Sequence, residues 1–163
     1  MLAVRQSAKR EQVPETLEAH EFRALMLKLP QKLRTKGIIS ATTDLRISEV
    51  LGLKWSDIDW KKLELKVTCS LVYARVGKCK TEVSRRPVPL DGLTVEELSK
   101  WHEACTYGQP SDRIFASERV GGKMPPWANT LLTRFSRPAA KEAKIAKRIG
   151  WHTFRHTYSN PPR

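Results

Sequence analysis

The spacing of apolar residues changes its period along this sequence, and that change limits the folds that the chain can form. Between residues 16 and 52 apolar side chains recur at helical spacing, as in Phe22, Leu25, Met26 and Leu29. From residue 63 the segment LELKV instead alternates apolar and polar residues, which is typical of a half-buried strand. The sequence therefore predicts an α+β domain that is mainly helical and carries a small three-stranded antiparallel sheet.

The expected elements follow from these periods and from the residues that end them. Three helices are expected before the strands: from about residue 16 to Pro30, over 31–43, and from Asp44 or Leu45 to Gly52. Two more are expected after them. One covers 94–104, with Thr94 and Glu97 in capping-box positions, and the other covers 127–146, with a break at Pro138. Strands are expected at 63–67, 70–76 and 85–90, the last at a sheet edge because it holds two prolines, with a short extended piece at 113–117. Residues 1–15 are expected to be disordered or extended, and residues 16–163 to form the domain.

The charge of the chain points to a polyanionic partner. Lys and Arg number 30 against 17 acidic residues, which gives a net charge of +13. The natural partner is a polyanion such as a nucleic acid, with an acidic membrane surface as the weaker alternative. No apolar run of about 18 residues and no secretory signal is present, so we expect no membrane span. Because no basic amphipathic helix or lipidation motif is present either, we expect no membrane contact, and with a nucleic-acid partner a cytoplasmic, nucleoid-associated protein. Cys69, Cys79 and Cys105 form no CxxC pair, so reduced thiols are expected rather than disulfides.

The segment TTDLRISEVLGLKWSDIDW contains the first candidate site residue. If Asp44 caps the third helix, Arg46 is its second residue, and a cation in a first turn opposes the helix dipole. An anion held at that position would remove the conflict, and a phosphate suits a guanidinium. The alternative is an Arg46 that faces solvent or pairs with Glu49 at i, i+3.

The segment GKCKTEVSRRPVPL contains the second candidate. Lys78 and Lys80 occupy one polar connection between expected strands, where a lysine can donate a proton or hold a phosphate. A solvated turn is the alternative. Arg85 and Arg86 point to opposite faces of a strand, so one of them at most can face a given ligand.

The segment WHTFRHTY contains the third. In a helix His152, Arg155 and His156 share one face, while Trp151, Phe154 and Tyr158 share another that we expect to be core. His152 and His156 at i, i+4 could bind zinc, but no third ligand with suitable spacing is evident, so no metal is expected. Imidazole beside guanidinium suits an oxyanion or a phosphate better.

The order of these three segments resembles the catalytic domain of the tyrosine recombinases, the phage integrase family. The resemblance spans roughly residues 16–160. Arg46 falls on the arginine of the family's first motif and Glu49 on its accompanying acid. Lys80 matches the hairpin lysine, with Lys78 as the fallback, and His152 and Arg155 match the family's His-x-x-Arg.

The resemblance implies a chemistry for these residues. In the family a tyrosine attacks the scissile phosphate of DNA and forms a 3′-phosphotyrosine link, without metal or cofactor. By this resemblance Arg46 and Arg155 would hold the nonbridging oxygens, Lys80 would protonate the leaving 5′-oxygen, and His152 would assist proton transfer.

The sequence departs from the family pattern at two places. Asp44 stands where the family usually has Gly; it tolerates a left-handed conformation, but it also places a carboxylate near the expected phosphate, which could weaken DNA binding. The segment that carries the family's second His or Trp and its nucleophilic Tyr is missing, and the core-binding domain is too. Tyr158 lies only three residues after Arg155 and is not expected to be the nucleophile; Tyr73 and Tyr107 lie elsewhere.

We therefore expect a catalytic domain that is truncated before the nucleophile and forms no covalent DNA adduct alone. Three interpretations stay open: an incomplete integrase, a non-catalytic DNA-binding or regulatory module with the integrase fold, and a chain whose tyrosine comes from another copy. Apolar surface near Trp151 and Phe154 is expected to be exposed, with a homo-oligomer on DNA as one consequence.

Overall fold

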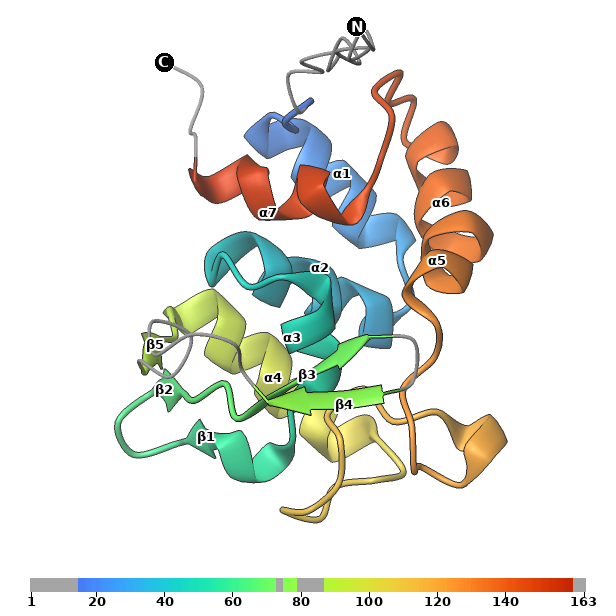
Figure 1. Cartoon of the computed structure of the whole chain (residues 1–163). Coiled ribbons are helices and arrows are strands. Elements are labelled where there is room, and N and C mark those ends of the chain that lie inside the picture. Colours follow the sequence, from blue (N-terminus) through green and yellow to red (C-terminus); the bar gives the residue numbers. More distant parts are fainter. Residues whose placement is uncertain (1–14, 73–74, 79–86, 160–163) are drawn as a thin grey trace, which may run out of the picture.

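The computed structural model describes residues 15–72, 75–78 and 87–159, and Figure 1 shows their arrangement. The helices are α1 (Ala19–Lys28), α2 (Gln31–Thr42), α3 (Ile47–Gly52), α4 (Gly92–Ala104), α5 (Ala128–Leu131), α6 (Arg137–Glu142) and α7 (Trp151–Ser159). The strands are β1 (Ile58–Asp59), β2 (Glu64–Leu65), β3 (Cys69–Val72), β4 (Arg75–Lys78) and β5 (Val88–Pro89). Short 3-10 turns lie at η1 (Trp55–Asp57) and η3 (Glu118–Val120).

Helix α2 lies between two hydrophobic cores. Leu33, Ile38 and Ala41 pack into the first core, which also takes residues from α1, α5, α6 and α7. Ile39, on the other side of the same helix, belongs to the second core, which takes residues from α3, the sheet and α4. Since α2 contacts both α7 and α4, it fixes the C-terminal helix relative to the half of the molecule that carries α3 (Figure 1).

The three helices expected before the sheet are present. The helical spacing of the first one is confirmed, since Phe22, Leu25 and Met26 are buried on one face of α1. Pro30 separates α1 from α2 as expected and stands at the N-cap of α2. The third helix begins at Ile47 rather than at Asp44 or Leu45, and Arg46 occupies its N-cap.

The three-stranded antiparallel sheet is present, but one of its strands is not the expected one. Its order is β1-β2-β5, with Leu65 paired to Ile58 on one side and to Val88 on the other. The expected strand at 70–76 is wrong: two strands, β3 and β4, pair there in an antiparallel hairpin of their own. Strand β1 is only two residues long, too short for an alternating pattern to indicate it.

Two details of the C-terminal half also differ from expectation. Helix α4 begins two residues earlier than predicted, because Asp91 caps it and accepts a hydrogen bond from the Thr94 backbone at 2.8 Å. The expected helix over 127–146 is divided by a five-residue π-helical segment (Leu132–Ser136), and Pro138 lies in the first turn of α6, where its missing N–H costs nothing.

One face of the last helix packs into the first core. Phe154 is fully buried and contacts the ring of Trp151 at 5.6 Å between centroids. Trp151 is half-buried, and its indole N–H donates to the Ala128 carbonyl at 3.0 Å. The core role expected for this face of α7 is thereby confirmed for Phe154.

Cys69 and Cys105 are free thiols, whereas Cys79 lies outside the described residues. None of the helices in the described part of the chain has the length and apolar character needed to cross a bilayer.

Candidate functional site

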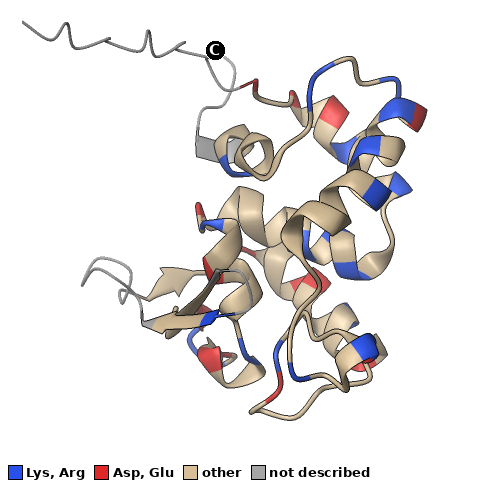
Figure 2. Cartoon of the chain, turned by 45° about the vertical axis from the view of Figure 1, so that its right-hand side comes forward, with Lys and Arg blue, Asp and Glu red and all other residues tan. Residues whose placement is uncertain are grey.

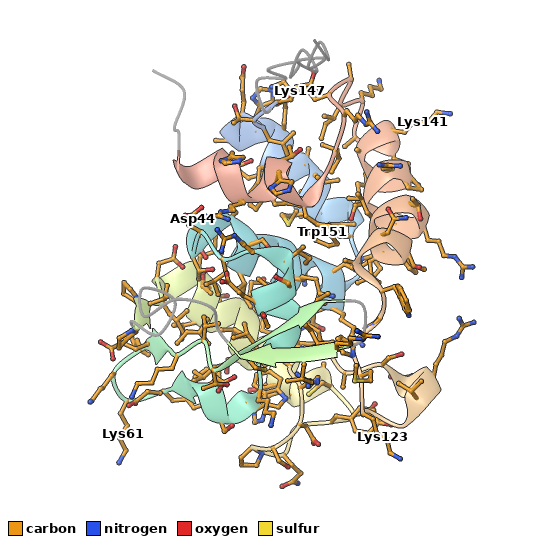
Figure 3. All side chains as sticks on the ribbon, in the orientation of Figure 1. Asp44, Lys61, Lys123, Lys141, Lys147 and Trp151 are labelled. Atoms are coloured by element: carbon orange, nitrogen blue, oxygen red, sulfur yellow. The ribbon has the colours of Figure 1, made fainter. Side chains whose placement is uncertain are left out.

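Arg155 and Asp44 form the contact around which the candidate site is built. Arg155 lies in the middle of α7, and Asp44 lies in the connection between α2 and α3; Figure 3 shows Asp44 below α7. The Arg155 Nε donates to one Asp44 carboxylate oxygen at 2.7 Å, and Nη2 donates to the other at 3.1 Å. This is the bidentate arrangement in which a guanidinium also takes up phosphate.

The backbone at Asp44 differs from the expectation of a helix cap. Its φ is 53°, in the left-handed region, and its carboxylate is bound to Arg155 rather than to the first turn of α3. Aspartate is one of the few residues other than glycine that adopt this conformation readily. The interpretation of Asp44 as a cap is therefore wrong, while its expected tolerance of a left-handed conformation is confirmed.

Arg46 comes two residues after Asp44, so its backbone lies within about 7 Å of that residue. It stands at the N-cap of α3, not at the expected second helical position. Its side chain is 67% exposed and lies 3.9 Å from the buried Glu49 carboxylate, which matches the pairing alternative. Glu49 also accepts the Arg46 backbone N–H at 2.8 Å, so it fixes the start of α3.

Both nearby carboxylates, Asp44 and Glu49, act on Arg155. The hydrogen bonds to Asp44 raise the pKa of Arg155 above its ordinary value; burial opposes this, and the charges of Asp44 and Glu49 add to it. Arg155 is therefore a permanent cation whose charge is balanced by nearby carboxylates. An incoming anion therefore meets a site in which the negative charges of Asp44 and Glu49 already offset part of the positive charge.

His152 is exposed one turn before Arg155 on α7. Its ring stacks on that of His156, with 6.3 Å between centroids, so the shared face predicted for this helix is present. Within the described residues no three His, Cys, Asp or Glu side chains gather as metal ligands. An exposed imidazole beside a guanidinium can accept or donate a proton at a bound oxyanion.

Several expected site residues cannot be placed. Lys80, Arg85 and Arg86 lie outside the described residues, and the side chain of the fallback Lys78, at the end of β4, does too. The side chain of Tyr158 is likewise outside the description, although its backbone continues α7. The structure thus brings together Arg46, Glu49 and Arg155, with His152 on the same helix as Arg155.

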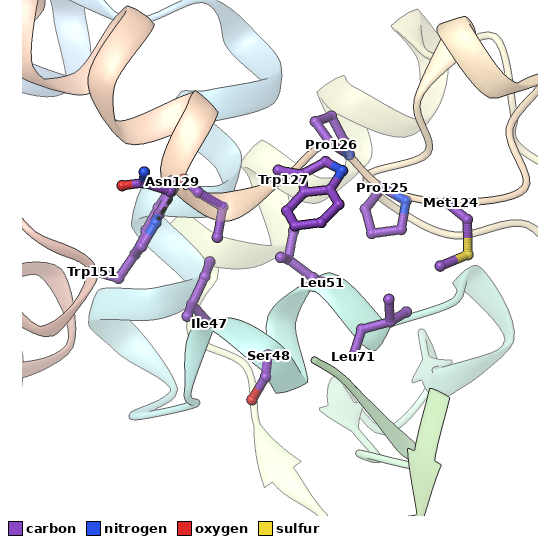
Figure 4. Close-up of a pocket in the computed structure, with 11 residues that line it drawn as sticks. Ile47, Ser48, Leu51, Leu71, Met124, Pro125, Pro126, Trp127, Asn129 and Trp151 are labelled. Atoms are coloured by element: carbon purple, nitrogen blue, oxygen red, sulfur yellow. Dashed lines mark hydrogen bonds between the residues drawn. The ribbon is translucent and has the colours of Figure 1, made fainter. Parts of the chain in front are cut away.

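A cavity of about 360 Å³ lies beside this cluster (Figure 4). Ile47 and Ser48, which follow Arg46 directly, line one side of it, and Trp151, which precedes His152, lines another. Its remaining wall comes largely from Leu51, Leu71 and residues 124–129. A larger cavity of about 620 Å³, between α1, α2, α4 and the end of α7, contains none of the predicted site residues.

Basic residues also gather away from the cluster. In Figure 2 the positions of Lys and Arg residues, coloured blue on the ribbon, gather along the helical side that carries α6 and the turn after it. Arg137, Lys141 and Lys144 are exposed there. The positive charge of the chain is therefore spread over a broad surface and is not confined to the candidate site.

A comparison with protein-family models decides the identity of the fold. The model described as "Phage integrase family" matches residues 4–160, nearly the whole chain. The chain belongs to the phage integrase family. No curated protein sequence matches it.

Solved structures of phage integrase relatives resemble this chain at low sequence identity. The Tn1549 transposon integrase in complex with a circular intermediate DNA has a TM-score of 0.76 at 18% identity, over 93% of this chain and 54% of that one. XerA recombinase has a TM-score of 0.68 at 21% identity, over 94% and 51%. A lambda integrase dimer bound to a COC′ core site has a TM-score of 0.63 at 23% identity, over 94% and 42%. The chain thus shares their fold and spans about half the length of the first two.

The sequence did not predict the direct partner of Arg155. Asp44 stood out as a departure from the family motif, but its carboxylate was expected only near a phosphate. Its residue type had already indicated that a positive φ is tolerated at this position. The pairing itself joins positions 111 residues apart, which no local pattern reveals.

Proposed function

We propose that this chain binds double-stranded DNA by holding a backbone phosphate at Arg46, His152 and Arg155, as the phosphate-holding part of an integrase-type strand-transfer site. Membership of the phage integrase family supports the proposal. The observation that carries it is the bidentate Arg155 contact, because that guanidinium is already presented to a pair of anionic oxygens.

Each residue of the site would have the role that its side-chain chemistry allows. Arg155 would hold two oxygens of one phosphate, and the exposed Arg46 would reach the same group from the start of α3. Glu49 would act on Arg46 by fixing its backbone. His152 would move a proton at the bound phosphate, and Lys80 would supply the proton for a leaving oxygen.

The proposal assigns phosphate binding to this chain and leaves strand cleavage to a nucleophile that these residues do not include. No cofactor or metal is needed for the binding that is proposed. DNA binding would place the protein at the nucleoid. Assembly of several copies on DNA is part of the proposal, in line with the lambda integrase dimer that was solved on a core site.

A non-catalytic DNA-binding module is the second candidate function, and the Asp44 contact favours it. A carboxylate that already occupies Arg155 lowers the gain from binding a phosphate there. Both candidates predict binding to duplex DNA that weakens with added salt, because phosphate contacts release counterions.

Replacement of Arg46 tests the proposal. Arg46→Ala should weaken binding to a labelled duplex by about 1–2 kcal/mol, with its exposure keeping the loss moderate. The slope of log K against log salt should fall by about 1, since one phosphate contact is lost. Fluorescence anisotropy at several salt concentrations measures both quantities.

The matched control is Arg119→Ala, which removes the same charge from the exposed 118–120 turn. If the two variants lose the same affinity, Arg46 contributes only to the general positive field. If the unmodified chain does not bind duplex DNA at low salt, the proposed function is wrong.

A further inference from the structure

The Nε–Nη2 edge of Arg155 is occupied by a side chain of the same molecule. Both Asp44 carboxylate oxygens accept hydrogen bonds from that edge, at 2.7 Å and 3.1 Å. We propose that Asp44 is an internal competitor of the DNA phosphate, so that it sets how strongly this chain holds DNA at Arg155. The inference rests on the proposed function and adds regulation to the same site.

The competition follows from the geometry of the guanidinium. A phosphate that binds Arg155 in bidentate fashion needs two N–H groups on one edge. The Arg155 side chain is only 24% exposed, so the protein covers most of it. A phosphate can take the Nε–Nη2 edge only after the Asp44 carboxylate has left it. The apparent affinity for a phosphate that uses this edge falls in proportion to the fraction of molecules in which the edge is open.

The backbone holds the competitor in place. Asp44 adopts a φ of 53° between α2 and α3, and this conformation presents its carboxylate to α7. Glu49 adds a second negative charge that acts on Arg155. Asp44 is 56% exposed, so solvent reaches the contact, and the pair can open without unfolding of the helices.

The conformation at position 44 allows the carboxylate to be removed without a change in the backbone. Glycine adopts a φ of 53° without steric cost, and asparagine tolerates it well. Asp44→Gly therefore removes the carboxylate while it keeps the conformation, and Asp44→Asn keeps the side-chain shape while it removes the charge. Circular dichroism and the midpoint of thermal unfolding show whether each variant is folded.

We expect Asp44→Gly and Asp44→Asn to bind a labelled duplex about three- to fivefold more tightly than the unmodified chain, because a partly exposed ion pair contributes up to about that much. Glu103→Gln, which removes a carboxylate from the exposed face of α4, is the control for net charge alone and should change affinity less than twofold.

The gain should also depend on Arg155. In an Arg155→Gln background, Asp44→Asn should raise affinity by twofold at most, because there is no guanidinium to release. Equal gains in the two backgrounds, or a gain no larger than that of Glu103→Gln, would show that Asp44 acts only through net charge and overturn the inference. If the unmodified chain binds DNA and the Asp44 variants bind no better, the inference alone is wrong. If neither the unmodified chain nor the Asp44 variants bind, the proposed function is wrong.

Discussion

Lys36 lies wholly inside the protein, with its ammonium 4.7 Å from the centroid of the Phe115 ring. Its Nζ has no hydrogen-bond partner among the described residues. Burial lowers the pKa of Lys36 well below its ordinary value, and the nearby charge of Lys32 lowers it further. The ring attracts the cation, but an ammonium without hydrogen bonds still costs the folded state free energy.

Lys36→Met should therefore stabilise the protein. Methionine has a similar length and needs no hydrogen bond, so we expect the free energy of unfolding at neutral pH to rise by about 1–3 kcal/mol. Urea unfolding measures the change. Lys28→Met, an exposed lysine on α1, controls for the general effect of the substitution and should leave stability within about 0.5 kcal/mol.

The cost of burying Lys36 should change with pH in one direction. Between the lowered pKa of folded Lys36 and the unfolded value near 10.4, the unfolded chain binds more protons at this position. The penalty at Lys36 therefore shrinks as the pH rises toward about 10, and the advantage of Lys36→Met should shrink with it. An advantage that is absent at neutral pH, or constant up to pH 10, would show that Lys36 is not buried as a costly charge.

At the scale of elements, the spacing of apolar residues predicted long helices and missed two-residue strands. The burial of Phe22, Leu25 and Met26 follows from their spacing alone. Strand β1 has two residues and strand β5 two, so each depends on pairing with β2 rather than on its own pattern. Where a single strand was expected at 70–76, two strands, β3 and β4, pair with each other, and no change of period in SLVYARV marks where one ends and the next begins.

The end of α3 packs against β3 with no space for a side chain. A Cβ at Gly52 would lie 2.5 Å from the Cys69 carbonyl oxygen, and the Gly52 carbonyl accepts hydrogen bonds from Cys69 Sγ at 3.2 Å and from Arg113 at 2.9 Å. The helix and the strand are thus held at a backbone-to-backbone distance that only glycine permits. This contact supports the helix whose N-cap is Arg46.

Gly52→Ala should lower the free energy of unfolding by about 1–3 kcal/mol, because backbone must move to admit the methyl group. Gly92→Ala is the matched control: a Cβ there meets no atom within 4 Å, at the first position of α4. That variant should be unchanged or more stable by up to about 1 kcal/mol. Thermal unfolding of the pair separates the contact from the general effect of the substitution, and equal midpoints would mean that α3 and β3 can separate freely.

At the scale of the whole molecule, the candidate site lies where the two cores meet. Arg155 is carried by α7, which packs on the first core, and Arg46 by α3, which packs on the second. The sequence predicted the candidates Arg46, His152 and Arg155 through their motifs. It could not predict the contact between Asp44 and Arg155, because that contact depends on how α2 holds the two halves together.

Hydrogen bonds join the start of the described chain to α7 and to the connection that precedes it, beside the first core. The Glu15 carboxylate accepts the Arg148 backbone N–H at 2.7 Å, and the Leu17 backbone N–H donates to Thr157 Oγ1 at 3.4 Å. Lys147 bonds Glu21 of α1 at 2.6 Å, across 126 positions of sequence. Desolvation by burial raises the pKa of Glu21, but the hydrogen bond from Lys147 and the backbone of Glu18 outweigh it, so the net pKa is lowered.

Glu21→Gln should therefore lower the free energy of unfolding, by an amount that depends on pH. Because both side chains keep some exposure, we expect a loss of up to about 1 kcal/mol at neutral pH. The unfolded carboxyl titrates near 4.5 and the folded one below it, so this contribution is complete above that pH and disappears as the pH falls through the folded value. Urea unfolding at neutral and acidic pH should show that the free energies of unfolding of the unmodified chain and of Glu21→Gln converge as the pH falls.

Glu96→Gln is the control for this prediction. It removes a carboxylate that bonds Lys100 one turn along α4, so it tests an ion pair that connects no distant segments. Should Glu21→Gln cost no more than Glu96→Gln, the first helix is held to the C-terminal helices by apolar packing and backbone bonds alone.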